Sequence, residues 1–299
     1  MIVVDLFCGC GGLSLGFQNA GYTIAASIDN WDAATDVYRL NFQHPVYKVD
    51  LMNVNKAVSV VSDYHPDMII GGPPCQDFSS AGSRNENGGR AILTVKYAEI
   101  VCAVRPRWFV MENVANITKY TKVFEAMDLF RKNGYGISFC VQNASLCGVP
   151  QRRKRFFMVG CQGKKDGFFD DYFKKDLSEK EMTLRAYFGN RLGVNAYYRH
   201  PRSYARRGVF SIDEPSPTIR GVNRPMPKGY KLHHNDPVST LKGIRPLTTL
   251  ERAEVQTFPS DYIWVGKKTE IEQMIGNAVP VKLAEHIAKL VLRYISDKE

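Results

Sequence analysis

A cysteine that follows two prolines is the most specific chemical signal in the sequence. Cys75 lies in the segment GGPPCQDFSS, residues 71–80, directly after an apolar run. Pro73 and Pro74 restrict the backbone before the thiol, and the Ser-, Asn- and Gly-rich residues 77–91 predict a long mobile loop after it. A rigid entry and a flexible exit suit a nucleophile that meets a substrate and is then covered. The buried structural role that is usual for a free thiol is expected of Cys8, Cys102, Cys140 and Cys161.

A carboxylate and two arginines are the other candidates for chemistry. Glu112 follows the apolar run 107–111, where a carboxylate costs desolvation energy unless it is used or paired. Arg153 and Arg155 lie at the entry to the apolar run 155–160, and the two-residue period of a strand places them on one face. Surface charge is the ordinary role of such arginines. Two guanidinium groups beside strand ends that carry a thiol and a carboxylate instead favour substrate positioning.

A glycine-rich turn, DLFCGCGGLSLGF, follows the first apolar run. Glycines there let the backbone approach a ligand above the strand ends. Ser14 stands where the dinucleotide fingerprint G-x-G-x-x-G has its third glycine, which disfavours a nicotinamide dehydrogenase. Asp29 and Asp50 end the next two apolar runs, where carboxylates can accept hydrogen bonds from ribose hydroxyls. The turn and the two acids together indicate an adenosine-type ligand.

The elements that position these residues alternate through the first 160 residues. Strands are expected at 2–7, 23–28, 46–49, 67–71, 107–111, 137–142 and 155–160, and helices at 12–20, 31–41, 53–63, 92–104 and 118–133. This order favours an α/β fold, a mostly parallel sheet with helices on both faces. From residue 161 the alternation is lost, which predicts a second, smaller, irregular domain.

The last helix is expected at 280–295, begun by Pro280. A small irregular domain offers little core, whereas a parallel sheet needs helices on both faces, so we expect the segment 275–295 to pack against the first domain. Its apolar stripe consists of Val281, Ala284, Ile287, Ala288, Val291 and Leu292.

The positive charge is concentrated in one stretch. The net charge is +10, and residues 151–244 contribute +11, against −1 from residues 1–150 and zero from residues 245–299. A charge run is usually a solvated face, but an excess confined to 94 residues and interleaved with tyrosines is typical of a surface that faces a polyanion. Nucleic acid is therefore the partner that the charge predicts.

The chain has 299 residues, of which 44% are apolar and 23% are charged. This composition is that of an ordinary globular protein and disfavours disordered and fibrous architectures. No apolar run approaches the ~18–20 residues of a membrane helix, and the chain opens without a secretory leader, so we expect a soluble cytoplasmic protein. The seven cysteines form no C-x-x-C pair. We therefore expect no disulfide framework, no metal site and no zinc deaminase chemistry.

Six segments in this order resemble the motifs of the DNA cytosine-5 methyltransferases, prokaryotic restriction-modification type, over about 280 residues. They are DLFCGCGG, GGPPCQDFS, Glu112-Asn113-Val114, the Q-x-R-x-R of Gln151, Arg153 and Arg155, RPLTTLERAEVQTFP at 245–259, and IGNAVPVKLAEHI at 275–287. Residues 161–244 occupy the place of the family's variable target-recognition region. Apart from EPSPTIRG, they contain no segment that resembles a family motif.

The resemblance implies a Rossmann-like sheet that uses S-adenosyl-L-methionine, with S-adenosyl-L-homocysteine as product. It makes Cys75 the nucleophile at cytosine C6, Glu112 the acid at N3, and Arg153 and Arg155 the residues that position the flipped-out base. The implied cofactor contacts are Phe7, Gly9, Gly11, Gly12, Asp29, Asn30, Asp50, Pro74, Leu93, Asn277 and Val279. The expected contacts to double-stranded DNA are Gln76, Ser79, Arg220 and Arg224.

The domains expected from the resemblance are a catalytic and cofactor-binding domain at 1–160, a target-recognition domain at 161–260, and a C-terminal segment at 261–299 that returns to the catalytic domain. A cognate restriction endonuclease would act on the same DNA sequence without forming a complex. The motifs depart from the family at Gly88-Gly89-Arg90-Ala91, in place of D-x-R-G, and at Leu250 and Glu254, where arginines are common.

Two further readings stay open. Transfer RNA could be methylated with the same motifs, but the C-F-T segment typical of that branch is absent. A non-catalytic nucleic-acid-binding protein could have kept the fold, but Cys75 and Glu112 are both intact.

Overall fold

The computed structural model describes residues 1–74, 91–201, 203 and 205–298. Cys75, Gln76, Ser79 and most of the loop expected at 77–91 lie outside these ranges. The chain forms two compact units. Unit 1 consists of Met1–Gln142, Lys154–Asp176 and Ala284–Glu299, and unit 2 of Asn143–Arg153 and Leu177–Leu283. The units therefore divide at other residues than the expected 160/161 and 260/261: residues 161–176 belong to unit 1, and residues 261–283 belong to unit 2.

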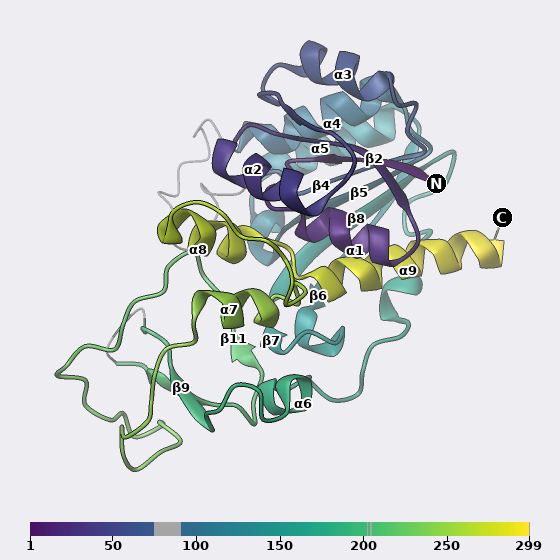
Figure 1. Ribbon diagram of the computed structural model, residues 1–299. Coiled ribbons are helices and arrows are strands. Elements are labelled where there is room, and N and C mark those ends of the chain that lie inside the picture. Colours follow the sequence, from purple (N-terminus) through teal and green to yellow (C-terminus); the bar gives the residue numbers. More distant parts are fainter. Residues whose placement is uncertain (75–90, 202, 204, 299) are drawn as a thin grey trace. The chain divides into compact units, whose positions relative to one another are not determined.

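Unit 1 is built on a seven-stranded sheet (Figure 1). The strands are β1 Ile2–Leu6, β2 Thr23–Asp29, β3 Val46–Lys48, β4 Met68–Gly71, β5 Trp108–Val114, β6 Tyr135–Asn143 and β8 Lys154–Gln162. Their order is β3-β2-β1-β4-β5-β8-β6. The pairs from β3 to β5 are parallel, and β8 runs antiparallel to β5. The predicted α/β fold is confirmed.

Helices cover both faces of this sheet, because each buries an apolar stripe. They are α1 Gly12–Asn19, α2 Asp32–Asn41, α3 Val54–Ser62, α4 Ile92–Val104 and α5 Thr121–Lys132, with part of α9 Val281–Lys298. Figure 1 shows α3, α4 and α5 side by side on one face. On the other face, Tyr22 after α1 donates a hydrogen bond to the Ala288 carbonyl of α9 at 3.2 Å.

The expectation that Glu112 ends a strand at 107–111 is wrong. Strand β5 continues to Val114 because β8 pairs with it along its whole length, from Trp108 opposite Cys161 to Val114 opposite Arg155. Glu112 and Asn113 therefore lie within a buried strand. A rigid strand fixes both side chains more firmly than a loop would.

Unit 2 contains short elements joined by long irregular segments. They are β7 Gln151–Arg152, α6 Leu184–Phe188, β9 Ala196–Tyr198, β10 Val209–Ser211, β11 Ser216–Pro217, α7 Thr249–Val255 and α8 Lys268–Asn277. In place of a large sheet, unit 2 has two sheets of two strands each, β10-β9 and β11-β7. This matches the irregular second domain that the loss of alternation predicts.

The departures at Leu250 and Glu254 have a local explanation in unit 2. Leu250 is 59% exposed, and Glu254 forms an ion pair with Arg191 at 2.8 Å. Arg252, which lies between them on α7, is buried, pairs with Glu272, and donates to the Arg220 carbonyl. One buried arginine therefore braces this part of unit 2.

None of the helices in the described parts of the chain is long and apolar enough to cross a membrane. Among the same residues, no group of three or more His, Cys, Asp or Glu side chains could hold a metal ion.

Candidate active site

The glycine turn after β1 is tied to the end of β2 by Asp29. The Asp29 carboxylate accepts hydrogen bonds from the Gly9 N–H at 2.8 Å and from the Trp31 N–H at 2.9 Å. Phe7, Gly9 and Gly11 have φ values of 60°, 52° and 86°, in the left-handed region that glycine adopts most easily. Asp29 therefore shapes the turn through its two oxygens.

The two glycines serve different purposes. A Cβ at Gly11 would lie 2.3 Å from Cε2 of Phe42, so Gly11 is required for packing. A Cβ at Gly9 would meet no atom within 4 Å, so the backbone there faces open space, as close approach of a ligand requires.

The neighbouring residues fit the predicted adenosine-type ligand. Asn30 and Asp50, at the ends of β2 and β3, are exposed, and Asp50 accepts a hydrogen bond from the Met52 N–H at 2.9 Å. Pro74 and Leu93 are partly exposed. All of these residues belong to unit 1, and the parallel strands β1 to β3 end at the same edge of its sheet.

A buried hydrogen-bond chain beneath the turn was missed by the sequence analysis. Ser14 donates to Asp5 at 2.5 Å, and Tyr38 donates to Ser14 at 2.7 Å. Ser27 and His44 contact the Tyr38 hydroxyl at 2.6 and 2.7 Å. Ser14, the residue in place of the third glycine, therefore links strand β1 to helix α2. The available signal was an acid inside the apolar run 2–7.

Asp5 predicts a measurable pH dependence of stability. Burial raises the pKa of this fully buried carboxyl to about 8 from an ordinary value of 3.8. The folded state therefore retains a proton that the unfolded chain loses, so the stabilisation from Asp5 is complete below about pH 4 and is lost as the pH rises to about 8. Asp5→Asn should remove this decline, which amounts to up to about 1.4 kcal/mol per pH unit. Urea unfolding at pH 5 and pH 8 measures it, and an equal decline in both proteins would contradict this account.

The predicted catalytic carboxylate is paired within unit 1. Oε1 of Glu112 lies 2.9 Å from Nε of Arg155, and the two side chains are only 11% and 14% exposed. The adjacent Asn113 donates from Nδ2 to the Pro73 carbonyl at 3.1 Å. A Cβ at Gly72 would lie 3.1 Å from Oε2 of Glu112. The structure thus brings Glu112 and Arg155 to the backbone that leads into Cys75.

Arg153 is placed differently from Arg155. Its buried guanidinium donates to the carbonyls of Ile219, Gly276 and Ala278 at 2.9 to 3.0 Å, all within unit 2. The expectation that the two-residue period of a strand places both arginines on one face is wrong, because β7 ends at Arg152 and β8 begins at Lys154, so Arg153 lies between two strands. Arg153 therefore holds three backbone segments of unit 2 together.

Gln151 and Gln256 extend the same clamp. Gln151 donates to Oε1 of Gln256 at 2.6 Å and accepts from the Ile219 N–H at 2.7 Å. Gln256 also donates to the carbonyl of Ile275 at 2.5 Å, and its role was not predicted. Asn277 is exposed and Val279 is buried; both lie in unit 2. Their expected contact with the cofactor stays a prediction.

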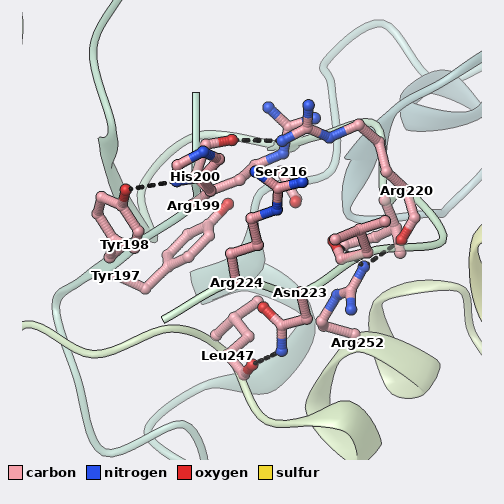
Figure 2. A pocket seen from close by; sticks show the side chains of 12 residues that line it. Tyr197, Tyr198, Arg199, His200, Ser216, Arg220, Asn223, Arg224, Leu247 and Arg252 are labelled. Carbon is pink, nitrogen blue, oxygen red and sulfur yellow. Dashed lines mark hydrogen bonds between the residues drawn. The ribbon is translucent and has the colours of Figure 1, made fainter. Parts of the chain in front are cut away.

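Four arginines line one pocket of unit 2 (Figure 2). They are Arg199, Arg220, Arg224 and Arg252, with His200, Tyr197 and Tyr198 among the other lining residues. Burial, together with the charges of Arg224 and Arg220, lowers the pKa of His200. None of the described residues that line the pocket is acidic, and of the four arginines Arg252 is paired with Glu272. The pocket is therefore electropositive, as a site for an anionic partner requires.

The sheet order, the glycine turn and the exposed Asn30 and Asp50 are those of an α/β protein suited to an adenosine-type ligand. Residues 1–293 match the model of the C-5 cytosine-specific DNA methylase family, and the chain belongs to this family. It is a DNA cytosine-5 methyltransferase whose cofactor is S-adenosyl-L-methionine and whose substrate is DNA. The family resemblance of the six motifs is thereby confirmed.

The relatives match along their full length. The chain is 52% identical to Type II methyltransferase M.HindV of Haemophilus influenzae, covering 98% of this chain and 97% of the relative. It is 48% identical to Type II methyltransferase M.HgiDI of Herpetosiphon aurantiacus, covering 99% and 96%. A solved structure of S. pombe Dnmt2 methyltransferase shares the fold, with a TM-score of 0.73 at 17% identity and 99% of both chains covered.

Proposed function

We propose that this enzyme methylates C5 of a flipped-out cytosine in a specific double-stranded DNA sequence, through a covalent adduct with Cys75, as the modification enzyme of a restriction-modification system. The observation that carries the proposal is the Glu112–Arg155 pair beside the Pro73 carbonyl, which Asn113 holds. The two full-length relatives named as type II methyltransferases support the biological setting. We propose the cytoplasm as its location, since the cellular DNA that it would modify lies there.

The chemistry requires these residue types. Cytosine C5 is a poor nucleophile until the Cys75 thiolate adds to C6. Glu112 donates a proton to N3 of the base and so stabilises the adduct, while Arg155 holds the carboxyl in place. The bound cofactor supplies an electrophilic methyl group for C5. Loss of the C5 proton to water, elimination of the Cys75 thiolate from C6 and return of the N3 proton to Glu112 then restore the aromatic base and the enzyme.

The cofactor is held by the edge of the sheet in unit 1. The proposed contacts are Phe7, Gly9, Gly11, Gly12, Asp29, Asn30, Asp50, Pro74 and Leu93. Asp29 already accepts hydrogen bonds from two backbone N–H groups, so we propose that its main role is to hold the turn in shape. We assign the hydrogen bonds with the ribose hydroxyls to Asn30 and Asp50.

DNA binding is assigned to the basic part of unit 2. Arg220 and Arg224 line the arginine pocket and are proposed DNA contacts. Arg153 supports this surface indirectly, because it binds the carbonyl of Ile219 next to Arg220. Gln76 and Ser79 stay predictions, since they lie outside the residues that the structure describes.

Bisulfite sequencing of DNA from cells that lack cytosine methylation and express this protein tests the proposal. We expect 5-methylcytosine in one sequence context and in no other, and resistance of that DNA to an endonuclease of the same specificity. Bisulfite sequencing of the cells' RNA is the matched control. Methylation confined to RNA, or absent from both, would reject the assignment.

A further inference from the structure

A single carboxylate holds the longest irregular basic segment of unit 2. Residues 221–244 are all described and form neither helix nor strand. They carry four lysine or arginine residues and one acid, Asp236. The donors to the Asp236 carboxylate are the N–H groups of Gly208 at 3.2 Å, Val209 at 3.0 Å and His233 at 2.9 Å, and the Tyr230 hydroxyl at 2.7 Å.

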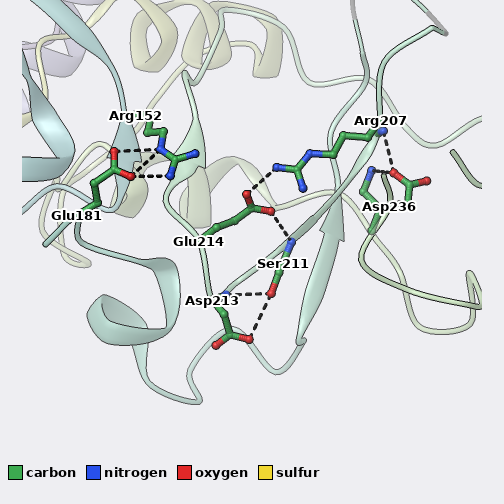
Figure 3. A network of polar contacts seen from close by, with 9 residues as sticks. Arg152, Glu181, Arg207, Ser211, Asp213, Glu214 and Asp236 are labelled. Atoms are coloured by element: carbon green, nitrogen blue, oxygen red, sulfur yellow. Dashed lines mark hydrogen bonds and ion pairs between the residues drawn. The ribbon is translucent and has the colours of Figure 1, made fainter. Parts of the chain in front are cut away.

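These bonds join the irregular segment to the β9-β10 hairpin. Figure 3 shows the Asp236 carboxylate against the backbone that follows Arg207, where β10 begins. The ring of Tyr230 packs edge-on against Tyr198 of β9, with centroids 5.2 Å apart. A Cβ at Gly208 would lie 2.8 Å from the Tyr230 hydroxyl, so a larger residue at this position would displace the Tyr230 side chain.

Asp236 is ionised in this setting. Partial burial acts to raise its pKa, but the N–H groups of His233, Val209 and Gly208 and the Tyr230 hydroxyl hold the pKa below its usual range. Hydrogen bonds to a charged acceptor are about twice as strong as neutral ones, so this carboxylate is an effective anchor for a loop that lacks secondary structure.

The anchored loop borders a cationic groove. The groove is lined by Arg206, Pro227, Gly229, Tyr230, Lys231 and His233. Tyr230 and His233 are both direct partners of Asp236, so the carboxylate fixes two of the six lining residues. Arg206 and Lys231 are exposed, and none of the described residues that line the groove is an acid.

We infer that this groove binds a phosphate group of the DNA backbone and that Asp236 is its positioning residue, an inference that rests on the proposed function. Arg206 and Lys231 offer the positive charge that a phosphate group needs, and none of the described lining residues is a carboxylate that would repel it. Lysine and arginine side chains also contact guanine edges in other complexes, so the sequence context of methylation is the readout that separates phosphate binding from base reading.

The salt dependence of DNA binding tests the groove. Each phosphate contact releases about one counterion, so Lys231→Gln should make the slope of log K against log[salt] shallower by about 1. The turnover at saturating DNA and the sequence context of methylation should not change. Lys228→Gln is the matched control, because Lys228 is exposed in the same segment but does not line the groove. Its slope should equal that of the native enzyme.

Variants of Asp236 test the positioning role. Asp236→Ala should raise KM for DNA about tenfold and leave kcat and the affinity for S-adenosyl-L-methionine unchanged. Asp236→Asn should recover part of the loss, because its amide oxygen can still accept from Gly208 and Val209. Adding Lys231→Gln to Asp236→Ala should give no further change in salt slope, since both remove the same contact.

Three results would overturn the inference. Equal slope changes in Lys231→Gln and Lys228→Gln would mean that the overall positive charge of the segment attracts the DNA, without a specific phosphate contact in the groove. A changed sequence context in Lys231→Gln would mean that the groove reads a base edge. Loss of stability in Asp236→Ala with a native salt slope would mean a purely structural role. In all three cases the native enzyme still methylates DNA. If the proposed function itself were wrong, the native enzyme would not methylate DNA at all.

Discussion

Replacing Cys75 with serine is expected to lower the rate of methyl transfer by at least about a thousandfold, because a serine hydroxyl has a far higher pKa than a thiol and is a much weaker nucleophile at neutral pH. Single-turnover transfer of a labelled methyl group to duplex DNA measures the rate. Binding of DNA and of S-adenosyl-L-methionine should stay within a few-fold of native, since the substitution is nearly isosteric. Near-native turnover would exclude the covalent mechanism.

Cys102→Ser is the matched control. Its thiol is half-buried on α4, 3.7 Å from the Leu129 carbonyl, and burial raises its pKa to about 12. Such a thiol remains protonated at neutral pH, so we expect little change in turnover. DNA carrying fluorine at C5 of the target cytosine should trap the native enzyme covalently, because fluorine cannot leave as a cation, and should not trap the Cys75 variant.

The positions of the elements in unit 1 could be predicted from the sequence because local patterns determine them. The apolar run 23–28 becomes β2 at Thr23–Asp29, and the helix expected at 92–104 has those bounds. The inner strands β1, β4 and β5 are buried almost throughout, and the helices bury one face, so the pattern of apolar residues in the sequence follows burial directly. The edge where the glycine turn, Asp29 and Asp50 meet follows from the same parallel order.

What could not be predicted depends on pairs far apart in the chain. The antiparallel pairing of β8 with β5, which keeps Glu112 inside a strand, joins segments about 45 residues apart. The contact of Gln151 with Gln256 spans 105 residues, and that of Arg153 with Gly276 spans 123. The period of apolar residues along one helix or strand contains no information on partners so far away in the chain. The surroundings of Asp5 were missed for the same reason, since Tyr38 reaches Ser14 from another helix.

The packing of residues 275–295 against the first domain is the prediction that joins the most distant parts of the chain, and unit 1 contains this segment only from Ala284 onward. Residues 284 onward belong to unit 1, and five of the six predicted stripe residues are buried, Leu292 being half-buried. The ring of Tyr294 lies with its centroid 5.0 to 5.7 Å from those of Trp108, Phe168, Phe169 and Tyr172. Residues 275–283, by contrast, lie in unit 2.

Tyr294→Ala is therefore expected to destabilise the enzyme by about 3–5 kcal/mol, the usual loss for a buried aromatic side chain. Arg293→Ala, at the adjacent position, removes an exposed ion pair with Asp176 and should cost less than about 1 kcal/mol. Urea unfolding of the full-length variants measures both. Equal losses would mean that the helix is held by its surface charges and not by the aromatic cluster.

Ending the chain at Leu283 removes only residues of unit 1 and should abolish binding of S-adenosyl-L-methionine. The deletion removes Tyr294 and so exposes the aromatic rings that pack against it, among them Trp108. It also removes the carbonyl of Ala288, which accepts a hydrogen bond from Tyr22. Tyr22 packs on Phe17 of α1, the helix that begins at the glycine turn, so the loss of the last helix reaches the cofactor site through packed side chains. Calorimetric titration measures the affinity. Native affinity in the shortened chain would show that the last helix is dispensable for the cofactor-binding unit.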